Sequence, residues 1–173
     1  KLCSICRDAD VVVCGMGLGS KSHHVVSTLA PECRKAVFDA DALRLPLPRA
    51  GETVYTPHSG EFTRITGKEP GTSVPDRAKA ALHAGIPGVT LLKGSVDIIA
   101  GQGRVRCNRS GTPAMTTGGT GDVLAGTCGG LLACLPAFDA ACIAAYATGR
   151  AGDIVSARKG YGMTAQDLLS VIP

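Results

Sequence analysis

The chain has 173 residues, 45% of them hydrophobic and 18% charged, so it is long enough for one domain with a sizeable core and is not intrinsically disordered. Its net charge of +4 comes without a dense basic run, which suits a small anionic ligand and does not require nucleic acid. Because aromatic residues make up only 3% and Trp is absent, surfaces that stack single-stranded bases are not expected.

Short apolar runs of strand type alternate along the chain with Ala-rich segments of helical type. This pattern is typical of an α/β fold whose mainly parallel sheet is covered on both faces. We expect strands at residues 10–14, 36–38, 53–55 and 89–92, then a hairpin of 97–100 and 104–107 that turns at 101–103. We expect helices at residues 21–29, 60–66, 75–84, 122–135, 137–159 and 164–171.

These elements predict a single domain over residues 1–173, because no repeat, low-complexity tract or linker divides the chain. Lys1 to Asp10 carries no initiator methionine and leads directly into a strand, so we expect the N-terminal part of the domain to be missing. The eight cysteines are scattered through apolar runs, as at Cys14 and Cys134, which is typical of buried thiols in a reducing cytoplasm. With no signal peptide and no membrane-spanning run, we expect a cytoplasmic protein without a membrane partner.

The most informative segment is the Gly/Thr-rich run from Met115 to Gly126, which leads into a helical pattern. Backbone N–H groups of a glycine-rich loop, together with those at the start of a helix, form a site for phosphate. Asp122 is unexpected there, because its charge repels phosphate unless it takes a proton from a hydroxyl that attacks phosphorus. The alternative is that Asp122 only complements the positive end of the helix dipole. Gly126, Gly129 and Gly130 inside this helix each cost about 1 kcal/mol, so we expect a close approach of another backbone or of a ligand.

Four other motifs follow predicted strands, at the sheet edge where α/β folds bind ligands. After the first strand, GMGLG (15–19) resembles a dinucleotide-binding turn, although a plain tight turn explains it equally well. After the second, the carboxylates of Asp39 and Asp41 suit a sugar hydroxyl or a hydrated metal ion, or else a local turn.

The third and fourth motifs follow the next two strands. In TPHSGE (56–61), His58 and Glu61 suit a ligand and a hydrated Mg²⁺, or a solvated histidine and a carboxylate that complements a helix start. In LLKGSVD (91–97), Lys93 can direct its charge at phosphate while Gly94 lets the backbone approach a nucleotide. The alternative for Lys93 is an edge lysine before a hairpin turn.

Taken in order, GMGLG, DADAL, TPHSGEF, LLKGSVDII and TTGGTGDVLAG resemble the ADP/ATP-dependent NAD(P)H-hydrate dehydratase family of the ribokinase-like superfamily. Residues 144–153 and 162–169 resemble the closing helices of that family. The resemblance implies a three-layer α/β/α sandwich with a C-terminal hairpin on a mainly parallel sheet. It also implies a repair reaction, in which the S-form of hydrated NADH or NADPH loses water while ADP becomes AMP and phosphate. ADP or ATP would be the phosphoryl donor, with Mg²⁺.

The resemblance assigns roles to residues of the motifs. Asp122 would be the catalytic base, and it would contact the hydrate together with Gly17, Gly19 and His58. Glu61 would position Mg²⁺ through water. The nucleotide would be held by the turn after the fourth strand and by the Gly/Thr loop: Lys93, Gly94, Ser95, Val96, Asp97, Gly118, Gly119, Thr120 and Gly121.

Two features depart from the family pattern, and other functions stay open. Met16 stands where the family usually has proline, and the first strands of the family domain have no counterpart here.

One alternative is a kinase of the same superfamily that acts on a vitamin precursor, and another is a non-catalytic nucleotide-binding module. The family resemblance also implies a homo-oligomer.

Overall fold

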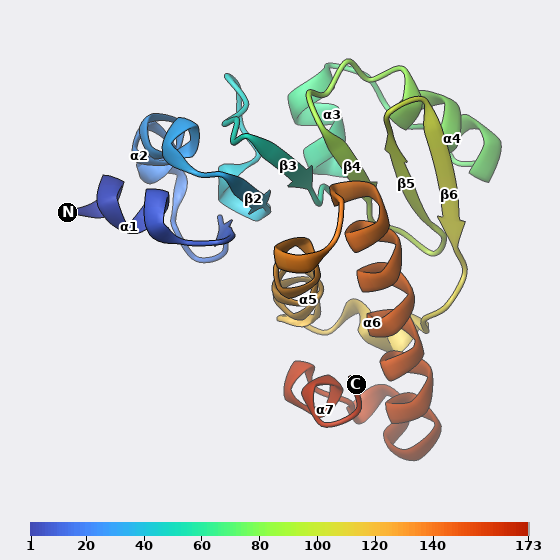
Figure 1. Ribbon diagram of the computed structural model, residues 1–173. Coiled ribbons are helices and arrows are strands. Elements are labelled where there is room, and N and C mark those ends of the chain that lie inside the picture. The colour runs from blue at the N-terminus through green and yellow to red at the C-terminus, as the bar shows by residue number, and fades with distance from the viewer. Residues whose placement is uncertain (173) are drawn as a thin grey trace.

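The computed structural model describes residues 1–172, apart from the side chain of Ser20 (Figure 1). Its centre is a six-stranded sheet in the order β1-β2-β3-β4-β5-β6. Strands β1 to β4 run parallel, and β5 and β6 add an antiparallel hairpin at the end of the sheet. The strands are β1 (Val12–Cys14), β2 (Lys35–Phe38), β3 (Glu52–Tyr55), β4 (Val89–Leu92), β5 (Asp97–Gly101) and β6 (Arg104–Asn108).

The helices α2 (His23–Leu29), α3 (Ser59–Thr66) and α4 (Val74–Leu82) cover one face of the sheet. Crossovers between parallel strands are right-handed, and here each new strand is added on the same side of the sheet. All crossover helices therefore lie on the same face. Side chains alternate along each strand, so Phe38 packs with the α2 residue Val26 while Val37 points to the opposite face. Full burial of a side chain such as Phe38 contributes about 1.5–3 kcal/mol to folding.

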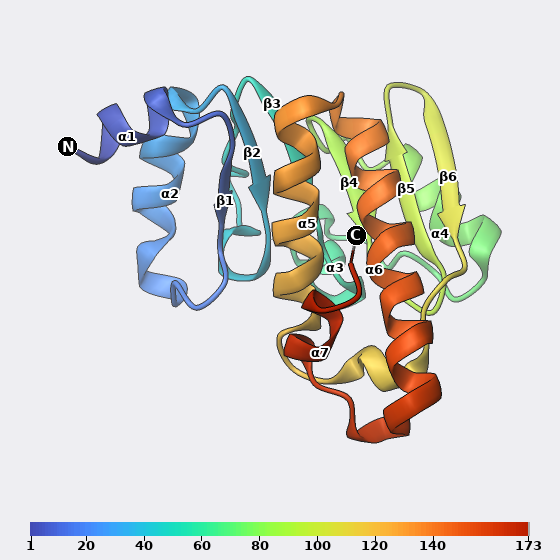
Figure 2. The ribbon, with the colours of Figure 1, turned by 60° about the horizontal axis from the view of Figure 1, so that its bottom comes forward.

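The other face is covered by α5 (Thr120–Cys134) and α6 (Ala137–Lys159), which lie side by side across the sheet (Figures 1 and 2). Two charged strand residues fix the junction of these helices. Lys35 Nζ donates to the carbonyl oxygen of Leu132 near the end of α5 (2.8 Å), and Glu52 Oε1 accepts from the Ala137 N–H at the start of α6 (2.7 Å). Each charge therefore complements the dipole of the helix end that it touches.

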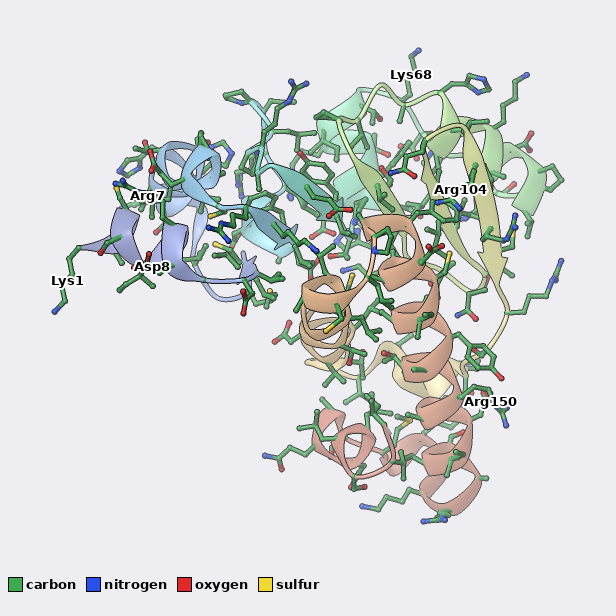
Figure 3. The ribbon with its side chains drawn as sticks, in the orientation of Figure 1. Lys1, Arg7, Asp8, Lys68, Arg104 and Arg150 are labelled. Carbon is green, nitrogen blue, oxygen red and sulfur yellow. The ribbon has the colours of Figure 1, made fainter. Side chains whose placement is uncertain are left out.

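Two further contacts complete this helical layer. Figure 2 places α7 (Ala165–Leu169) against the ends of α5 and α6. Arg104, labelled in Figure 3, has its Cζ 4.0 Å from the ring centroid of Phe138, which ties the β5–β6 hairpin to the first turn of α6. The predicted α/β sandwich with its C-terminal hairpin is therefore confirmed.

Several element boundaries differ from the prediction. The N-terminal segment contains α1 (Leu2–Asp8), which was not predicted; it is short, and only Cys6 of its side chains is buried. An ion pair of 2.9 Å between Arg7 and Glu32 attaches α1 to the 3-10 helix Ala30–Glu32. The predicted helix at 21–29 begins with the 3-10 turn Ser20–Ser22. Short 3-10 helices also occur at Ala40–Ala42, Pro113–Thr116 and Gly160–Gly162.

The glycines of α5 and the cysteines also differ from expectation. A Cβ atom at Gly129 would overlap the side chain of Val13, so here α5 approaches β1 closely, through a side chain and not through the backbone or ligand that was expected. The same test at Gly126 and Gly130 meets no described atom within 4 Å. All eight cysteines are free, but Cys107 and Cys134 are exposed and not buried. No helix within residues 1–172 is both long and apolar enough to cross a membrane.

Candidate active site at the carboxyl edge of the sheet

The parallel strands bring the sequence motifs to one edge of the sheet. Asp39 follows β2 directly, and its N–H donates to the carbonyl oxygen of Cys14 at the end of β1 (3.0 Å). A bridge between His58 and Lys93 extends the pairing of β3 and β4, with the Lys93 N–H 2.8 Å from the Pro57 carbonyl oxygen. The segments that follow β2, β3 and β4 therefore meet, as the sequence predicted.

A buried ion pair lies at the centre of this edge. Lys93 Nζ is 2.7 Å from Asp39 Oδ1, and the two side chains are 20% and 3% exposed. The backbone of Gly121 lies against this pair: a Cβ atom there would sit 3.6 Å from Lys93 Nζ and 3.8 Å from Asp39 Oδ2. The ammonium group of Lys93 and the positive end of α5 therefore converge on one place.

The Gly/Thr loop has free backbone donors at the same place. Thr120 Oγ1 donates to the carbonyl oxygens of Met115 and Thr117, which closes the loop (2.6 and 3.0 Å), and Gly119 adopts a positive φ of 91°. Within residues 1–172, no hydrogen bond satisfies four N–H groups of the loop and first turn: those of Gly118, Gly119, Gly121 and Asp122. Such a set of unpaired N–H groups can bind an anion.

Asp122 stands in the first turn of α5 with an exposed side chain. Its carboxylate has no hydrogen bond or ion pair with any side chain or backbone group that the structure describes. An unpaired carboxylate at a helix start can accept a proton from a ligand or complement the positive end of the helix dipole.

A cavity of about 760 Å³ opens beside the anion site. It lies between the turn after β4, the segment from Ser110 to Thr116, and the facing helices α5 and α6. Of the predicted site residues, it is lined by His58, Lys93, Gly94, Ser95, Asp97, Thr120 and Gly121. A smaller cavity of about 450 Å³ between α3 and α4 contains none of them.

The turn from Lys93 to Asp97 is shaped by its own side chains. Asp97 Oδ1 accepts a hydrogen bond from the Gly94 N–H, and Asp97 Oδ2 accepts one from Asn108 Nδ2, both at 3.0 Å. Burial raises the pKa of the Asp97 carboxyl, and these hydrogen bonds oppose that shift. Val96 does not line the cavity, because its side chain packs against the cluster of buried residues around Phe62.

Arg77 supports the same turn from α4. Its guanidinium donates to the carbonyl oxygen of Lys93 (3.0 Å) and to Ser59 Oγ (2.9 Å). A Cβ atom at position 94 would be 2.6 Å from Arg77 Nη2, so a larger residue there would displace the guanidinium. Burial lowers the pKa of Arg77, and the nearby charge of Asp97 opposes that shift.

His58 and Glu61 form a reciprocal cap at the start of α3. The Glu61 N–H donates to His58 Nδ1 (3.2 Å), and the His58 N–H donates to Glu61 Oε2 (2.8 Å). The His58 side chain is 60% exposed at the cavity, whereas that of Glu61 is 8% exposed. No group of three His, Cys, Asp or Glu side chains in the described chain is arranged to hold a metal ion.

Gly17 and Gly19 lie outside the cavity, in the turn after β1. Both have positive φ values, 67° and 71°, and the Gly19 N–H donates to Asp41 Oδ2 (2.9 Å). The second carboxylate of DADAL therefore holds the GMGLG turn. Asp39 and Asp41 take part in an ion pair and a turn contact, and with the described residues they form no metal site.

The sequence pointed to Met115 and Thr116 but not to the cavity wall formed by residues 110–113 or to the floor formed by Ala145, Thr148 and Gly149 of α6. One signal was present, because Gly149 interrupts an Ala-rich helix at a cost of about 1 kcal/mol. A Cβ atom at Gly149 would lie 2.6 Å from the Ser110 carbonyl oxygen, so this glycine lets the 110–116 segment rest on α6.

Comparisons with known proteins identify the family of this chain. A family model described as NAD(P)H-hydrate dehydratase matches residues 2–173. The bifunctional NAD(P)H-hydrate repair enzyme Nnr of Methanospirillum hungatei is 61% identical over 98% of this chain, which spans 35% of that protein. The ADP-dependent (S)-NAD(P)H-hydrate dehydratase of Nitrosopumilus maritimus is 39% identical over 96% of this chain and 61% of its own length. The chain thus spans about a third of the length of the first of these relatives.

Solved structures give the same result. The Bacillus subtilis ADP/ATP-dependent NAD(P)H-hydrate dehydratase, co-crystallized with ATP/Mg²⁺, matches with a TM-score of 0.80 at 28% identity, covering 99% of this chain and 67% of that one. A ribokinase-like superfamily protein of Enterococcus faecalis matches with a TM-score of 0.80 at 23% identity, covering 98% and 64%; this likeness confirms the ribokinase-like fold alone. From the family match, the chain belongs to the NAD(P)H-hydrate dehydratase family.

Proposed function

We propose that this chain binds ADP in the cavity beside α5 and uses it to dehydrate the S-form of hydrated NADH and NADPH. The observation that carries the proposal is that Lys93 and the free N–H groups of the Gly/Thr loop meet at Gly121, with the unpaired carboxylate of Asp122 on the next residue of α5. An anion site beside a free base is what phosphoryl transfer to a hydroxyl requires. The choice of ADP is supported by the printed name of the N. maritimus relative.

In the proposed reaction, Asp122 takes the proton of the ring hydroxyl while the oxygen of that hydroxyl attacks the β-phosphorus of ADP. The bond from that phosphorus to the bridging oxygen breaks, and AMP leaves. Lys93 and the N–H groups of Gly118, Gly119 and Gly121 stabilise the charge of the transferred phosphoryl group. The lone pair of the ring nitrogen then expels phosphate, and loss of a ring proton restores the reduced nicotinamide.

The other predicted residues surround these groups. Gly94, Ser95 and Val96 would present backbone to the nucleotide, and Asp97 would hold their turn in place. Thr120 would keep the Gly/Thr loop closed through its hydroxyl. His58 would contact the hydrate at the mouth of the cavity, with Gly17 and Gly19 across the edge of the sheet.

Mg²⁺, when bound, would neutralise charge on the nucleotide phosphates. Glu61 would contact it through water, because one of its carboxylate oxygens already accepts the His58 N–H. The free cysteines support a cytoplasmic location. The homo-oligomeric state is proposed from the family resemblance alone.

The experiment mixes the protein with hydrated NADH, Mg²⁺ and either ADP or ATP, and follows the absorbance of reduced nicotinamide. Recovery of absorbance with equal amounts of AMP and phosphate is expected with ADP, and no recovery without a nucleotide. Phosphorylation of a vitamin alcohol without any recovery from the hydrate would instead identify a kinase of the same superfamily.

A further inference from the structure

One buried side chain lies between two walls of the nucleotide cavity. Asn108 ends β6 and is 8% exposed. On one side of it is the turn from Lys93 to Asp97, and on the other is the segment that begins at Ser110. No motif of the sequence singled out this residue.

The amide group of Asn108 bonds to both walls and to the cavity floor. Its Nδ2 donates to Asp97 Oδ2 (3.0 Å), to the Ala145 carbonyl oxygen of α6 (3.1 Å) and to the Ser110 carbonyl oxygen (3.3 Å). Its Oδ1 accepts from the N–H (3.2 Å) and hydroxyl (2.7 Å) of Ser110. Asp97 connects Asn108 to the turn after β4, because its other oxygen accepts a hydrogen bond from the Gly94 N–H.

The fold explains why asparagine serves here. Asp97 and Asn108 are directly opposed at the open end of the β5–β6 hairpin, so their side chains meet. Both carboxylate oxygens of Asp97 accept hydrogen bonds. Ser110 offers two donors, its N–H and its hydroxyl, and one acceptor, its carbonyl oxygen. The amide of Asn108 can donate to one wall while it accepts from the other, which a carboxylate cannot do.

We propose that Asn108 is a positioning residue for nucleotide binding, which sets the spacing of the two cavity walls through Asp97 and Ser110. Asn108 touches no substrate. The identity of the ligand as ADP rests on the proposed function. Because the walls are backbone segments, loosening them weakens nucleotide binding while the groups around Asp122 stay in place. Asn108 therefore governs the affinity for ADP and not the chemical step.

The test uses an exchange of the two side chains in the full-length protein. Asn108→Asp and Asp97→Asn each remove the donor–acceptor match, and we expect each to raise the Kd for ADP about tenfold. The double exchange recreates a donor facing an acceptor, keeps an acceptor for the Gly94 N–H and one for Ser110, and preserves the net charge. We expect it to bring the Kd below that of either single variant but not fully back, because a carboxylate at position 108 cannot donate to the carbonyl oxygens of Ala145 and Ser110. Cys107→Ser, an exposed neighbour on β6, is the control and should change nothing.

The readouts separate positioning from a structural or catalytic role. Calorimetric titration with ADP gives the Kd, thermal unfolding without ADP reports the fold, and the dehydration assay splits KM for ADP from kcat. A rise in KM with kcat unchanged within about twofold supports positioning. Lower thermal stability with an unchanged Kd in the folded protein, or a double exchange no better than the single ones, would overturn it. If either single variant fails to fold, the other single variant decides in the same way.

The titration needs no hydrate, so it distinguishes this inference from the proposed function. If ADP binds and depends on Asn108 but the hydrate is not dehydrated, only the proposed function fails. If dehydration occurs and neither single variant changes the Kd, only the role of Asn108 fails. Absence of ADP binding in the unsubstituted protein would overturn both.

Discussion

Replacement of Gly149 by alanine tests the contact between α6 and the segment that walls the cavity. A Cβ atom at this position would overlap Ser110 Oγ and lie 2.6 Å from the Ser110 carbonyl oxygen. Because ordinary non-bonded contacts begin near 3.5 Å, Ser110 must move by roughly 1 Å. The segment cannot yield as a flexible side chain would, since two of the three Ser110 atoms that the Cβ would meet belong to the backbone.

Two opposing effects set the size of the change. Alanine is favoured over glycine inside a helix by about 1 kcal/mol. Overpacking of a filled contact costs about 1–3 kcal/mol. We therefore expect Gly149→Ala to lower the free energy of unfolding by about 1 kcal/mol, which corresponds to a fall in Tm of about 2–4 °C for a domain of this size. Movement of the cavity wall should also raise the KM for ADP.

Gly126→Ala in α5 is the matched control, because a Cβ atom there meets no described atom within 4 Å. It gains the helix preference without the clash, so its Tm should rise by about 2–4 °C. Differential scanning calorimetry of the two variants measures both shifts. If Gly149→Ala raised the Tm as much as Gly126→Ala does, the segment from Ser110 would not rest on α6 and the reasoning would be refuted.

Other predictions concern charges that fix the fold. Asp39→Ala leaves the ammonium group of Lys93 without its partner in a largely buried place, so urea denaturation should show a loss of about 3 kcal/mol; a loss below 1 kcal/mol would contradict a buried pair. Glu52→Gln removes a charge from the start of α6, where it complements the helix dipole, and should lower the Tm by about 2–4 °C in thermal unfolding. The ion pair with Lys159 lowers the pKa of Asp167 to about 2, below its unfolded value near 3.8. The stability that this ion pair contributes is therefore present above pH ~4 and is lost as the pH falls toward 2. Asp167→Asn should flatten the fall of Tm in that acid window, and an unchanged profile would exclude the link.

The sheet and the longest helices could be predicted because their hydrophobic patterns are strong. The run Val89–Leu92 is buried throughout, and α6 begins and ends at the predicted residues. The short helix α1 could not be predicted, since it buries only Cys6 and is attached by the contact of Arg7 with Glu32. Such contacts depend on chain segments that meet only in the folded protein.

The site could be predicted at the level of motifs but not of partners. The motifs after β2, β3 and β4 meet because parallel strands share a carboxyl edge. Which side chain bonds to which is decided by three-dimensional geometry: Asp39 pairs with Lys93, and Asp41 holds Gly19. For the same reason, nothing in the sequence around Asn108 indicated its contact with α6.

The measurement that tests the central claim most directly is the rate of hydrate dehydration by Asp122→Asn at saturating ADP. The exposed side chain of Asp122 has no partner among the described residues, so the variant should keep its Tm and its Kd for ADP. If Asp122 is the base, kcat should fall by about 10²–10⁴-fold. A variant that kept kcat within about threefold would contradict the assignment of Asp122 as the base.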